Sequence, residues 1–500
     1  MPAASALPLA KSAPMSPPPL PSRKARVVVL VLTAITVLGA ALRLWHLGSK
    51  SLWLDEGATV ALARMSWRHF AWVWWHGEAN LQTIYFLLMR GWIHLGASEA
   101  WIRLPSALFG IASIPVMYLV ARKFMAQAPA LAAAALLALN PTHIYYSQEA
   151  RSYSLTILLV LLSSYFFVRA VEVNCRKDWV LWTVLGILAV YSHYFAALVM
   201  VAQACSLFFK RKPTPWRPMI LGGVVILAAA IPGLTYVFRA SPENLHFIWM
   251  PPASLKAMWH LAMFFGGSGS KIALALLLWM AGIVAMVSGQ RRVGDEDDYW
   301  RRVLVLLWFV VPVALIALAS LRHPIFLQRY MVFSLPATIL LAAFGMDALR
   351  KWKIGPILVI ALCVMSLPAI VKGYHKPRED WRGASNAVLA SATPGDAVVF
   401  FPFYTRIMFD YYHDRPTDGV PAVHVFAPAF YDGGEDAHDL LKVLDRSPRA
   451  FPHVWILMAD HGTKMETFTD GAAMAETLQS IFGAPEVRKF ADIDVLEFGK

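Results

Sequence analysis

The amino-acid sequence predicts an α-helical polytopic membrane protein with about eleven transmembrane helices and a small C-terminal α/β domain. Of its 500 residues, 58% are hydrophobic and only 15% are charged, against roughly 25% charged residues in a soluble domain. Apolar stretches of about 20 residues recur from residue 27 to residue 373, and each could cross a ~30 Å hydrocarbon core. After residue 373 the apolar runs shorten and alternate with helical patterns, as in an α/β domain.

Short polar or basic loops separate the predicted spans within residues 27–373. The third span is short, and the eighth is interrupted by "GGSGS" at 266–270. The spans are expected near residues 27–45, 101–121, 128–140, 154–171, 179–191, 194–209, 219–238, 257–288, 303–321, 330–349 and 354–373.

The formal charge of +13 reflects the basic loops that orient the chain in a membrane, and it gives no support for a nucleic-acid partner. Lysines and arginines cluster in short loops between the apolar runs, as the positive-inside rule requires of cytoplasmic loops. If the N-terminus is cytoplasmic, every cluster falls on the cytoplasmic side, and an odd number of spans places the C-terminal segment outside. The clusters lie at residues 23–26, 122–123, 176–177, 210–212, 291–302 and 350–353.

Three regions follow from this topology. Residues 1–22 are rich in Pro, Ala and Ser and are predicted to be a disordered cytoplasmic tail. Residues 23–373 form the transmembrane domain, with a site at its outer face. Residues 374–500 form a periplasmic α/β domain with strands at "DAVVFF", "AVHVF" and "HVWILMA" and helices at "REDWRGASNAVLASA", "DAHDLLKVLDR" and "DGAAMAETLQSIF".

Carboxylates are scarce on the outer side before residue 374, and acids beside a membrane are costly unless solvated or paired. Each is therefore a functional candidate with a structural alternative. Asp55 and Glu56 could cap an interfacial helix, Glu149 could pair with Arg151, and Glu99 and Glu243 could be a helix cap and a solvated loop residue. The acids are Asp55, Glu56, Glu78, Glu99, Glu149 and Glu243.

Together these outer groups suit acid–base and phosphate chemistry. One carboxylate could act as a general base, and Arg151 and Arg329 suit bidentate binding of a phosphate. Tyrosine hydroxyl and imidazole groups in the same loops could supply further contacts. The other substrate-site candidates are Glu78, Asn80, His143, Tyr146, Gln148, Glu149, Tyr153, His193 and Tyr194.

Five stretches in order resemble the GT-C membrane glycosyltransferases. They are "LWLDEGATVALA" after the first span, "IRLPSALFGIASIPVMYLVARKF", "NPTHIYYSQEARSYSL", "FLQRYMVFSLPATILLAAFG" and "DWRGASNAVL", and they cover roughly residues 27–400. The bacterial relatives include protein O-mannosyltransferases, aminoarabinose transferases of lipid A and rhizobial lipopolysaccharide-core glycosyltransferases. One departure is Asn80 in "EANLQTIYF", where many relatives have the histidine of a His–Pro–Pro stretch.

The resemblance implies a donor sugar carried on a polyprenyl phosphate. It implies that Asp55 is the catalytic base, that Glu56 supports it, and that Arg151, Arg329 and Tyr330 bind the donor phosphate. We therefore expect inverting transfer of a sugar to a hydroxyl of a lipid, glycan or protein at the outer face of the bacterial cytoplasmic membrane. No cofactor is certain, and a divalent metal ion stays open. The alternatives are a transporter or flippase of lipid-linked sugars and a non-catalytic scaffold.

Overall fold

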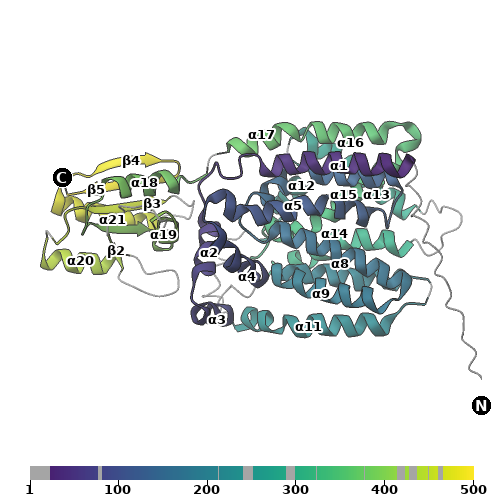
Figure 1. Cartoon of the computed structure of the whole chain (residues 1–500), viewed down its shortest axis with the longest axis horizontal. Helices are drawn as coiled ribbons and strands as arrows, with labels where there is room; N and C mark the ends of the chain where they lie inside the picture. The colour runs from purple at the N-terminus through teal and green to yellow at the C-terminus, as the bar shows by residue number, and fades with distance from the viewer. Residues whose placement is uncertain are drawn as a thin grey trace, which may run out of the picture.

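The computed structural model describes residues 23–76, 82–211, 213–239, 252–267, 269–288, 299–322, 324–376, 378–413, 423–426, 436–448, 450–459 and 466–499. Long helices lie side by side in a bundle, and a sheet with its own helices lies beyond one end of the bundle (Figure 1). The start of α1 lies at the opposite end from the sheet. Residues 1–22, and with them the predicted tail, lie outside the described residues.

The bundle is built around α8 and α15, whose apolar windows are 78% and 83% buried, whereas that of α1 is only 11% buried. Helices with apolar side chains all round are expected at the centre of a bundle. The outer helices leave large apolar side chains exposed, as lipid-facing helices do. The helices are α1 (Arg23–Leu44), α5 (Glu99–Ala121), α6 (Gln127–Ala138), α7 (Pro141–Ser147), α8 (Tyr153–Val173), α9 (Arg176–Ser192), α10 (Ala197–Ser206), α11 (Trp216–Arg239), α12 (Leu255–Gly266), α13 (Ser270–Val287), α14 (Tyr299–Ala319), α15 (Leu335–Ala348), α16 (Ile354–Val364) and α17 (Leu367–His375).

Within the described residues, seven helical segments are long and apolar enough to cross a membrane. The predicted eighth span consists of α12 and α13, which bend by 88° at a short break and bring the number to eight if they form one span. The predicted spans at 128–140 and 194–209 are shorter apolar helices, and the one at 179–191 lies in α9, of 17 residues. The count of eleven therefore stays a prediction. The seven segments are Arg23–Leu44, Glu99–Ala121, Tyr153–Val173, Trp216–Gly233, Tyr299–Ala319, Gln328–Ala348 and Ile354–His375.

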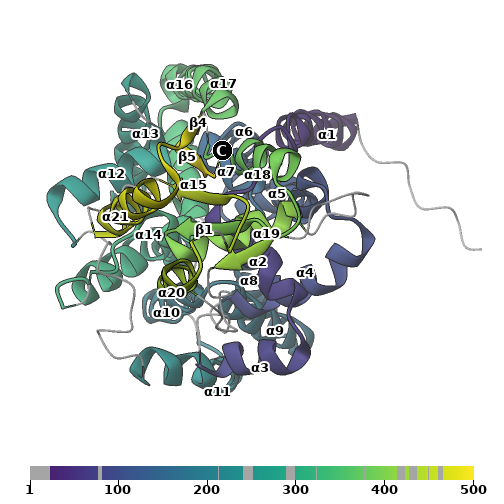
Figure 2. The same ribbon diagram turned by 90° about the vertical axis from the view of Figure 1, so that its left-hand side faces the viewer.

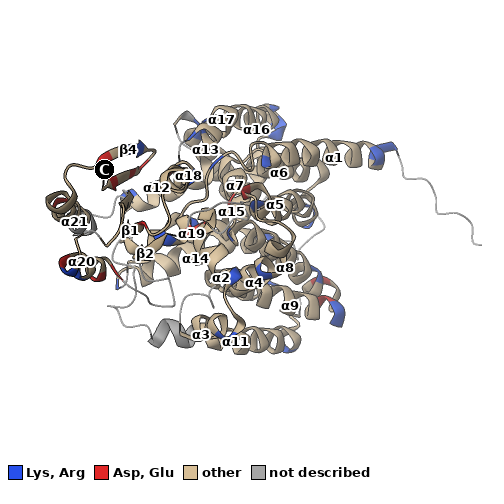
Figure 3. Ribbon diagram, turned by 60° about the vertical axis from the view of Figure 1, so that its left-hand side comes forward, with Lys and Arg blue, Asp and Glu red and all other residues tan. Residues whose placement is uncertain are grey.

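The two ends of the bundle differ in charge, and α5 connects them. At its first residue, Glu99 accepts a hydrogen bond from Arg382 of the sheet region at 2.9 Å. Just beyond its other end, Lys123 pairs with Glu172 at 2.9 Å, and Glu172 pairs with Arg301 at 2.8 Å. Two of the predicted basic clusters, those of Lys123 and Arg301, therefore lie at the end of the bundle remote from the sheet, and Figure 3 shows the basic start of α1 away from it as well.

Three short helices cover the end of the bundle next to the sheet. They are α2 (Leu54–Arg64), α3 (Trp67–His76) and α4 (Thr83–Trp92). Figure 2, which looks onto this end, shows α2 behind α19 of the sheet region and α3 beside α11.

The C-terminal region folds around a five-stranded sheet of order β2-β1-β3-β5-β4. β1 is parallel to β2 and β3, and β5 is antiparallel to β3 and β4. Successive side chains of β1 face opposite sides: Ala397 and Val399 pack against α20 and α21, and Val398 and Phe400 pack toward α18 and α19. The elements are α18 (Trp381–Ser391), β1 (Ala397–Phe401), α19 (Arg406–His413), β2 (His424–Phe426), α20 (Ala437–Arg446), β3 (Val454–Ala459), α21 (Glu466–Phe482), β4 (Glu486–Phe490) and β5 (Ile493–Phe498).

The sheet region is joined to the bundle by a continuous apolar core. The buried residues Trp381, Val388 and Met408 belong to the same packed cluster as the interior of the bundle. The three predicted strands and three predicted helices are confirmed, whereas α19, β4 and β5 were not predicted. The fold class is therefore as expected: a helical membrane protein with a small C-terminal α/β unit.

Candidate active site

The two adjacent carboxylates at the start of α2 face different surroundings. Asp55 and Glu56 lie in the first turn of the helix, after Trp53, whose extended backbone (φ −110°, ψ 170°) leads the chain into it. Adjacent residues of a helix point about 100° apart. Glu56 is fully buried, whereas 23% of the Asp55 side chain is exposed. Asp55 is thus the member of the pair that a substrate can reach.

Glu56 is held by Arg103, which lies one turn inside α5. The Arg103 Nε atom donates to Oε1 of Glu56 at 2.8 Å, and its Nη2 atom donates to Oε2 at 2.6 Å. Oε1 also accepts the backbone N–H of Ala150 at 2.8 Å. Burial alone raises the pKa of Glu56, but the charge and hydrogen bonds of Arg103 outweigh it and lower that pKa. The remaining Arg103 donors bind the carbonyls of Leu47, Lys50 and Ser51.

Arg103 therefore uses all five of its N–H donors to fix Glu56 and the loop that leads into α2. The backbone N–H of Trp53 also points to Glu56 Oε2, at 3.4 Å, so this acid caps the helix as well. Glu56 is thus fixed beside Asp55, and the structural alternative of a helix cap applies to Glu56.

Asp55 faces two arginines from distant parts of the chain. Its Oδ2 atom lies 3.2 Å from Nη1 of Arg329 and 3.9 Å from Nε of Arg151. Arg151 also donates to the Asp55 carbonyl at 3.2 Å and to the hydroxyl of Thr59 at 3.4 Å. The structure thus brings together the predicted base and the two predicted phosphate ligands.

An aromatic wall lines the same site. The rings of Tyr146 and Tyr153 meet at 4.7 Å, His193 lies 6.1 Å from Tyr153, and Tyr330 lies 5.6 Å from His193. Burial, together with the charges of Arg151 and Arg329, lowers the pKa of His193 to about 3. The imidazole is therefore neutral and can serve as a hydrogen-bond partner.

Several buried polar atoms at this site lack a hydrogen-bond partner among the described residues. They are Nε of Arg151, the Tyr153 hydroxyl and Nδ1 of His193, whereas Oδ2 of Asp55 makes only the ion pairs with the two arginines. Leaving a buried polar group unsatisfied costs about 1–3 kcal/mol, so such groups in native proteins call for an explanation. Their concentration around one carboxylate indicates a polar site that water or a polar ligand completes.

Glu149 lies behind this site and is also buried. Its Oε1 atom accepts from Nη2 of Arg378 at 2.8 Å, and Nη1 of the same arginine lies 3.4 Å from Glu56. The predicted pair with Arg151 is therefore replaced by a pair with Arg378. Burial raises the pKa of Glu149 to about 7, despite the opposing charge of Arg378.

Other predicted residues lie elsewhere. His143 binds Arg43, its Nδ1 lying 2.6 Å from Nη2, and Gln148 donates to the carbonyls of Arg43 and Trp45. The ring of Tyr194 lies against Gly233 of α11. These side chains connect helices and do not meet Asp55. Glu78 and Asn80 lie outside the described residues.

Arg103 and Arg378 contact the acids of the candidate site, and the sequence reasoning missed both. Arg103 is a charged residue within a predicted span, and such residues are functional candidates by default. Arg378 stands in "KPRED", directly after the last predicted span, and gave no comparable signal. Both act on acids that are distant in sequence.

The described residues do not fit a metal centre. No group of three His, Cys, Asp or Glu side chains in the described part of the chain is placed to hold an ion. The carboxylate of Asp55 faces cationic groups instead of further metal ligands. The possible divalent metal ion stays a prediction, since the candidate Glu78 lies outside the described residues.

Comparisons with known proteins bear on the fold that carries this site. Residues 83–236 match the family model described as dolichyl-phosphate-mannose-protein mannosyltransferase. A sequence search of curated proteins gives no significant match. The apo structure of ArnT from Cupriavidus metallidurans is similar over 95% of this chain and 98% of its own, at 15% identity and a TM-score of 0.63.

Two further solved structures have the same architecture. ArnT from Cupriavidus metallidurans bound to undecaprenyl phosphate matches 94% of this chain and 98% of its own, at 14% identity and a TM-score of 0.59. The oligosaccharyltransferase AglB from Archaeoglobus fulgidus, in complex with an inhibitory peptide and a dolichol phosphate, matches 95% of this chain and 74% of its own, at 11% identity and a TM-score of 0.54. The chain therefore has the GT-C fold, and the resemblance to membrane glycosyltransferases expected from its motifs is confirmed.

Proposed function

We propose that this protein is a glycosyltransferase that moves a sugar from a polyprenyl phosphate to an acceptor hydroxyl at the outer face of the bacterial cytoplasmic membrane. One observation carries the proposal. A partly exposed carboxylate, Asp55, faces two arginines in a site with several unsatisfied buried polar atoms. This is the set of groups that removal of a proton and departure of a phosphate require.

In the proposed reaction, the acceptor oxygen attacks the anomeric carbon of the donor sugar. Asp55 takes the proton of that hydroxyl, and the bond between the anomeric carbon and the phosphate oxygen breaks. The electron pair of this bond stays on the leaving phosphate, whose charge Arg151 and Arg329 stabilise. Direct displacement inverts the anomeric centre, and no covalent enzyme intermediate is needed.

The two arginines near Asp55 suggest the order of events, with donor binding before deprotonation of the acceptor. In the free protein both arginines lie near Asp55. A donor phosphate, with its own oxygens and charge, would draw the guanidinium groups toward itself. The carboxylate would then be released for the acceptor hydroxyl. Tyr330 and the neutral His193 would supply further contacts to the sugar or phosphate.

The comparisons support a lipid-linked donor in general terms. One solved relative of the fold was obtained with undecaprenyl phosphate and another with a dolichol phosphate. The matched family model carries the same kind of donor in its description. Neither the sugar nor the acceptor follows from these comparisons. The acceptor stays open as a lipid, a glycan or a protein.

The two alternatives explain less. A transporter or flippase would place its charged groups near the middle of the bilayer, whereas the site lies at the end of the bundle next to the sheet. A scaffold for the C-terminal unit leaves the unsatisfied atoms around Asp55 without a role.

The proposal also requires a particular orientation of the protein in the membrane. The N-terminus and the basic ends of the helices would be cytoplasmic, and residues 374–500 would be periplasmic. Reporter fusions after residue 150 and within 374–500 should report an external location, and a fusion at residue 212 a cytoplasmic one. A cytoplasmic C-terminal unit would overturn the assignment of the site to the outer face.

The experiment that tests the function is transfer from radiolabelled undecaprenyl-phosphate sugars by purified protein, with membrane lipids and proteins as acceptors. Asp55→Asn keeps the shape and removes the base, so turnover should fall about 10²–10⁴-fold at saturating donor. Asp445→Asn, at an exposed position in α20, is the matched control and should keep full turnover. Near-normal turnover of Asp55→Asn would overturn its assignment as the base.

A further inference from the structure

The loop between α1 and α2, residues 45–53, leads directly into the helix that carries Asp55. It consists of turns and extended chain, including a turn in which Ser49 donates to the carbonyl of His46. The left-handed backbone of His46 (φ 55°) is uncommon for a residue other than glycine. Such a loop keeps one position only when other parts of the chain pair with its buried polar groups.

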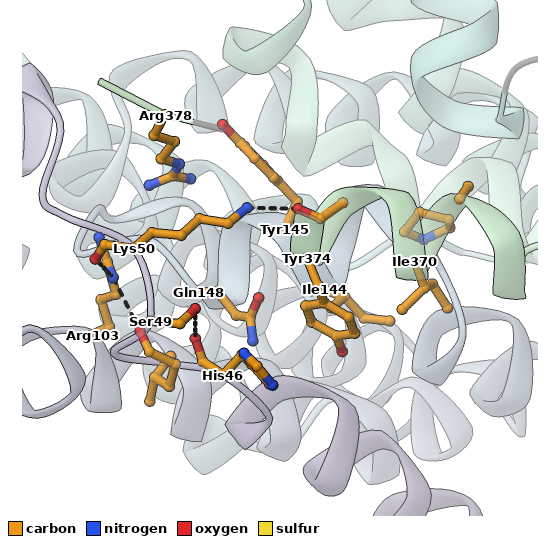
Figure 4. Close-up of a pocket in the computed structure, with 14 residues that line it drawn as sticks. His46, Ser49, Lys50, Arg103, Ile144, Tyr145, Gln148, Ile370, Tyr374 and Arg378 are labelled. Atoms are coloured by element: carbon orange, nitrogen blue, oxygen red, sulfur yellow. Dashed lines mark hydrogen bonds between the residues drawn. The ribbon is translucent and has the colours of Figure 1, made fainter. Parts of the chain in front are cut away.

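The helix bundle supplies one set of partners for this loop. Arg103 of α5 donates to the carbonyls of Leu47, Lys50 and Ser51. Figure 4 shows Arg103 beside the backbone of the loop, with the side chain of Lys50 extended toward the end of α17. There the Lys50 amine donates to the carbonyl of Gly373 at 2.6 Å.

The C-terminal unit supplies a second set of partners. The Nη2 atom of Arg382 in α18 donates to the carbonyl of Gly48 at 3.0 Å. The hydroxyl of Ser51 donates to the carbonyl of Glu379, just before α18, at 2.6 Å. The polar groups of residues 48–51 are therefore shared between the bundle and the C-terminal unit.

Tyr412 of α19 binds the loop just before α2 begins. Its hydroxyl accepts the backbone N–H of Leu52 at 3.0 Å, and the two residues are only 3% and 0% exposed. Leu52 stands three residues before Asp55, so even a fully extended chain would place them at most about 11 Å apart. A phenylalanine at position 412 would fill nearly the same space, but it would leave the buried N–H of Leu52 without this acceptor.

Tyr411, the preceding residue of α19, makes a similar contact with another part of the bundle. Its hydroxyl donates to the carbonyl of Ala97, just before α5, at 2.6 Å, and its side chain is also buried. Figure 2 shows α19 in front of α2 at this end of the bundle. Two adjacent tyrosines thus reach two different segments: Tyr412 the loop of Asp55, and Tyr411 the approach to α5.

We propose that Tyr412 is a positioning residue for Asp55. By fixing the N–H of Leu52, it sets the place at which α2 begins, and with it the approach of the Asp55 carboxylate to the acceptor hydroxyl. Arg151 and Arg329 stand in other segments, so this role concerns the base and not the donor phosphate. The inference rests on the proposed function, because it gives the C-terminal unit a part in the step assigned to Asp55.

Tyr412→Phe and Tyr411→Phe form a matched pair for the test, since each removes one buried hydroxyl of α19. In transfer from radiolabelled undecaprenyl-phosphate sugars, Tyr412→Phe should lower kcat about tenfold to hundredfold, because a shift of a catalytic group by about 1 Å costs on this order. Its KM for the lipid donor should stay within about twofold. Tyr411→Phe should keep kcat within about twofold, although both variants should lower the melting temperature in detergent by similar amounts.

Hydrogen exchange of the full-length protein in detergent gives a reading that needs no turnover. Peptides covering residues 47–57 should show exchange of the Leu52 N–H about tenfold faster in Tyr412→Phe, and exchange at the wild-type rate in Tyr411→Phe. A wild-type exchange rate in Tyr412→Phe, an unchanged kcat in that variant, or an equal loss of kcat in both variants would overturn the proposal.

The two readings also separate this proposal from the proposed function. If the wild type transfers sugar and Tyr412→Phe loosens the loop without loss of kcat, the positioning role is wrong and the proposed function stands. If the wild type transfers no sugar from the lipid donor while Tyr412→Phe still loosens the loop, the proposed function is wrong. In that case the contact between Tyr412 and Leu52 holds the loop without a catalytic role.

Discussion

The Oδ2 atom of Asp55 lies 3.2 Å from the Nη1 atom of Arg329, although 274 positions separate the two residues in the chain. The contact joins the start of α2 to the segment before α15, and Arg151 approaches the same oxygen from a third segment. A carboxylate and two arginines from three segments can exchange partners when a phosphate enters. In the proposed reaction, this exchange would couple donor binding to the release of the base.

The first prediction concerns the arginines. Arg151→Ala and Arg329→Ala should each raise the KM for the lipid donor about tenfold to hundredfold, because each removes a charge-assisted hydrogen bond worth about 1.5–3 kcal/mol. Lysine at either position should restore only part of the loss, since it lacks the planar fork. Arg350→Ala, at the exposed basic cluster beyond α15, is the control. Wild-type donor kinetics in both alanine variants would show that the arginines are structural only.

The second prediction concerns the clamp between Arg103 and Glu56. Breaking a buried pair by removing one partner costs about 3–5 kcal/mol, so Arg103→Met and Glu56→Gln should both lower the free energy of unfolding in detergent. Because Arg103 also holds the loop that leads into α2, its variant should lose turnover as well. The partly exposed pair of Lys123 and Glu172 is the comparison, and Lys123→Gln should change stability by less than about 1 kcal/mol. Equal small effects in all three variants would argue against the clamp.

The third prediction concerns the contact between α2 and the C-terminal unit. A Cβ atom at Gly57 would meet the Sδ atom of Met408 in α19, and Ile407 lies 3.4 Å from the same position. Gly57→Leu should therefore push α19 away from the helix that carries Asp55. Displacement of a catalytic group by about 1 Å can cost on the order of a hundredfold in rate. We expect a large loss of turnover and faster proteolysis between the bundle and α18.

Gly91 of α4 provides the matched control for Gly57. A Cβ atom at this position meets nothing within 4 Å, so Gly91→Leu should keep both turnover and resistance to proteolysis. If Gly57→Leu behaves in the same way, the C-terminal unit does not position α2.

The sequence predicted the helices and strands whose residue patterns are local. The short apolar runs that became β1 and β3 and the helical stretches that became α18 and α20 were readable because each has a uniform local pattern and clear flanks. β4 was missed because three of its five residues, Glu486, Arg488 and Lys489, are charged and give a weak strand pattern. The weakness is physical, since β4 is an edge strand paired only with β5.

The sequence predicted the site residues that stand in recognisable motifs. It could not predict which residue each charged side chain takes as its partner. Asp55, Arg151 and Arg329 stood in recognisable stretches, and the structure brings them together. The partner of Glu149 could not be read from its neighbours. The nearby Arg151 was the obvious candidate, yet Arg378, 229 positions away, makes the bond. His143 likewise looked available to a substrate, whereas tertiary packing places it against Arg43.

The last prediction concerns the titration of Glu149. Its folded pKa is about 7, above the usual value of about 4.3 for an exposed glutamate. When the folded state holds the proton more tightly than the unfolded chain does, the stability from this group is fully present below the unfolded pKa. It is lost as the pH rises through the folded pKa. The difference between the two pKa values corresponds to about 4 kcal/mol, of which about 3 kcal/mol should disappear between about pH 5 and about pH 8.

Glu149→Gln removes this titration and keeps an oxygen that can accept from Arg378. The difference in free energy of unfolding between wild type and variant should therefore favour the wild type more at about pH 5 than at about pH 8, by about 3 kcal/mol. Measuring the difference removes the contribution of all other titrating groups. A difference that is independent of pH, or one that grows with rising pH, would mean that Arg378 keeps Glu149 ionised in the folded state. In that case the charge of Arg378, and not burial, would decide the protonation of this site, because an ion pair that lowers the pKa of its carboxylate gives stability that is lost at low pH instead.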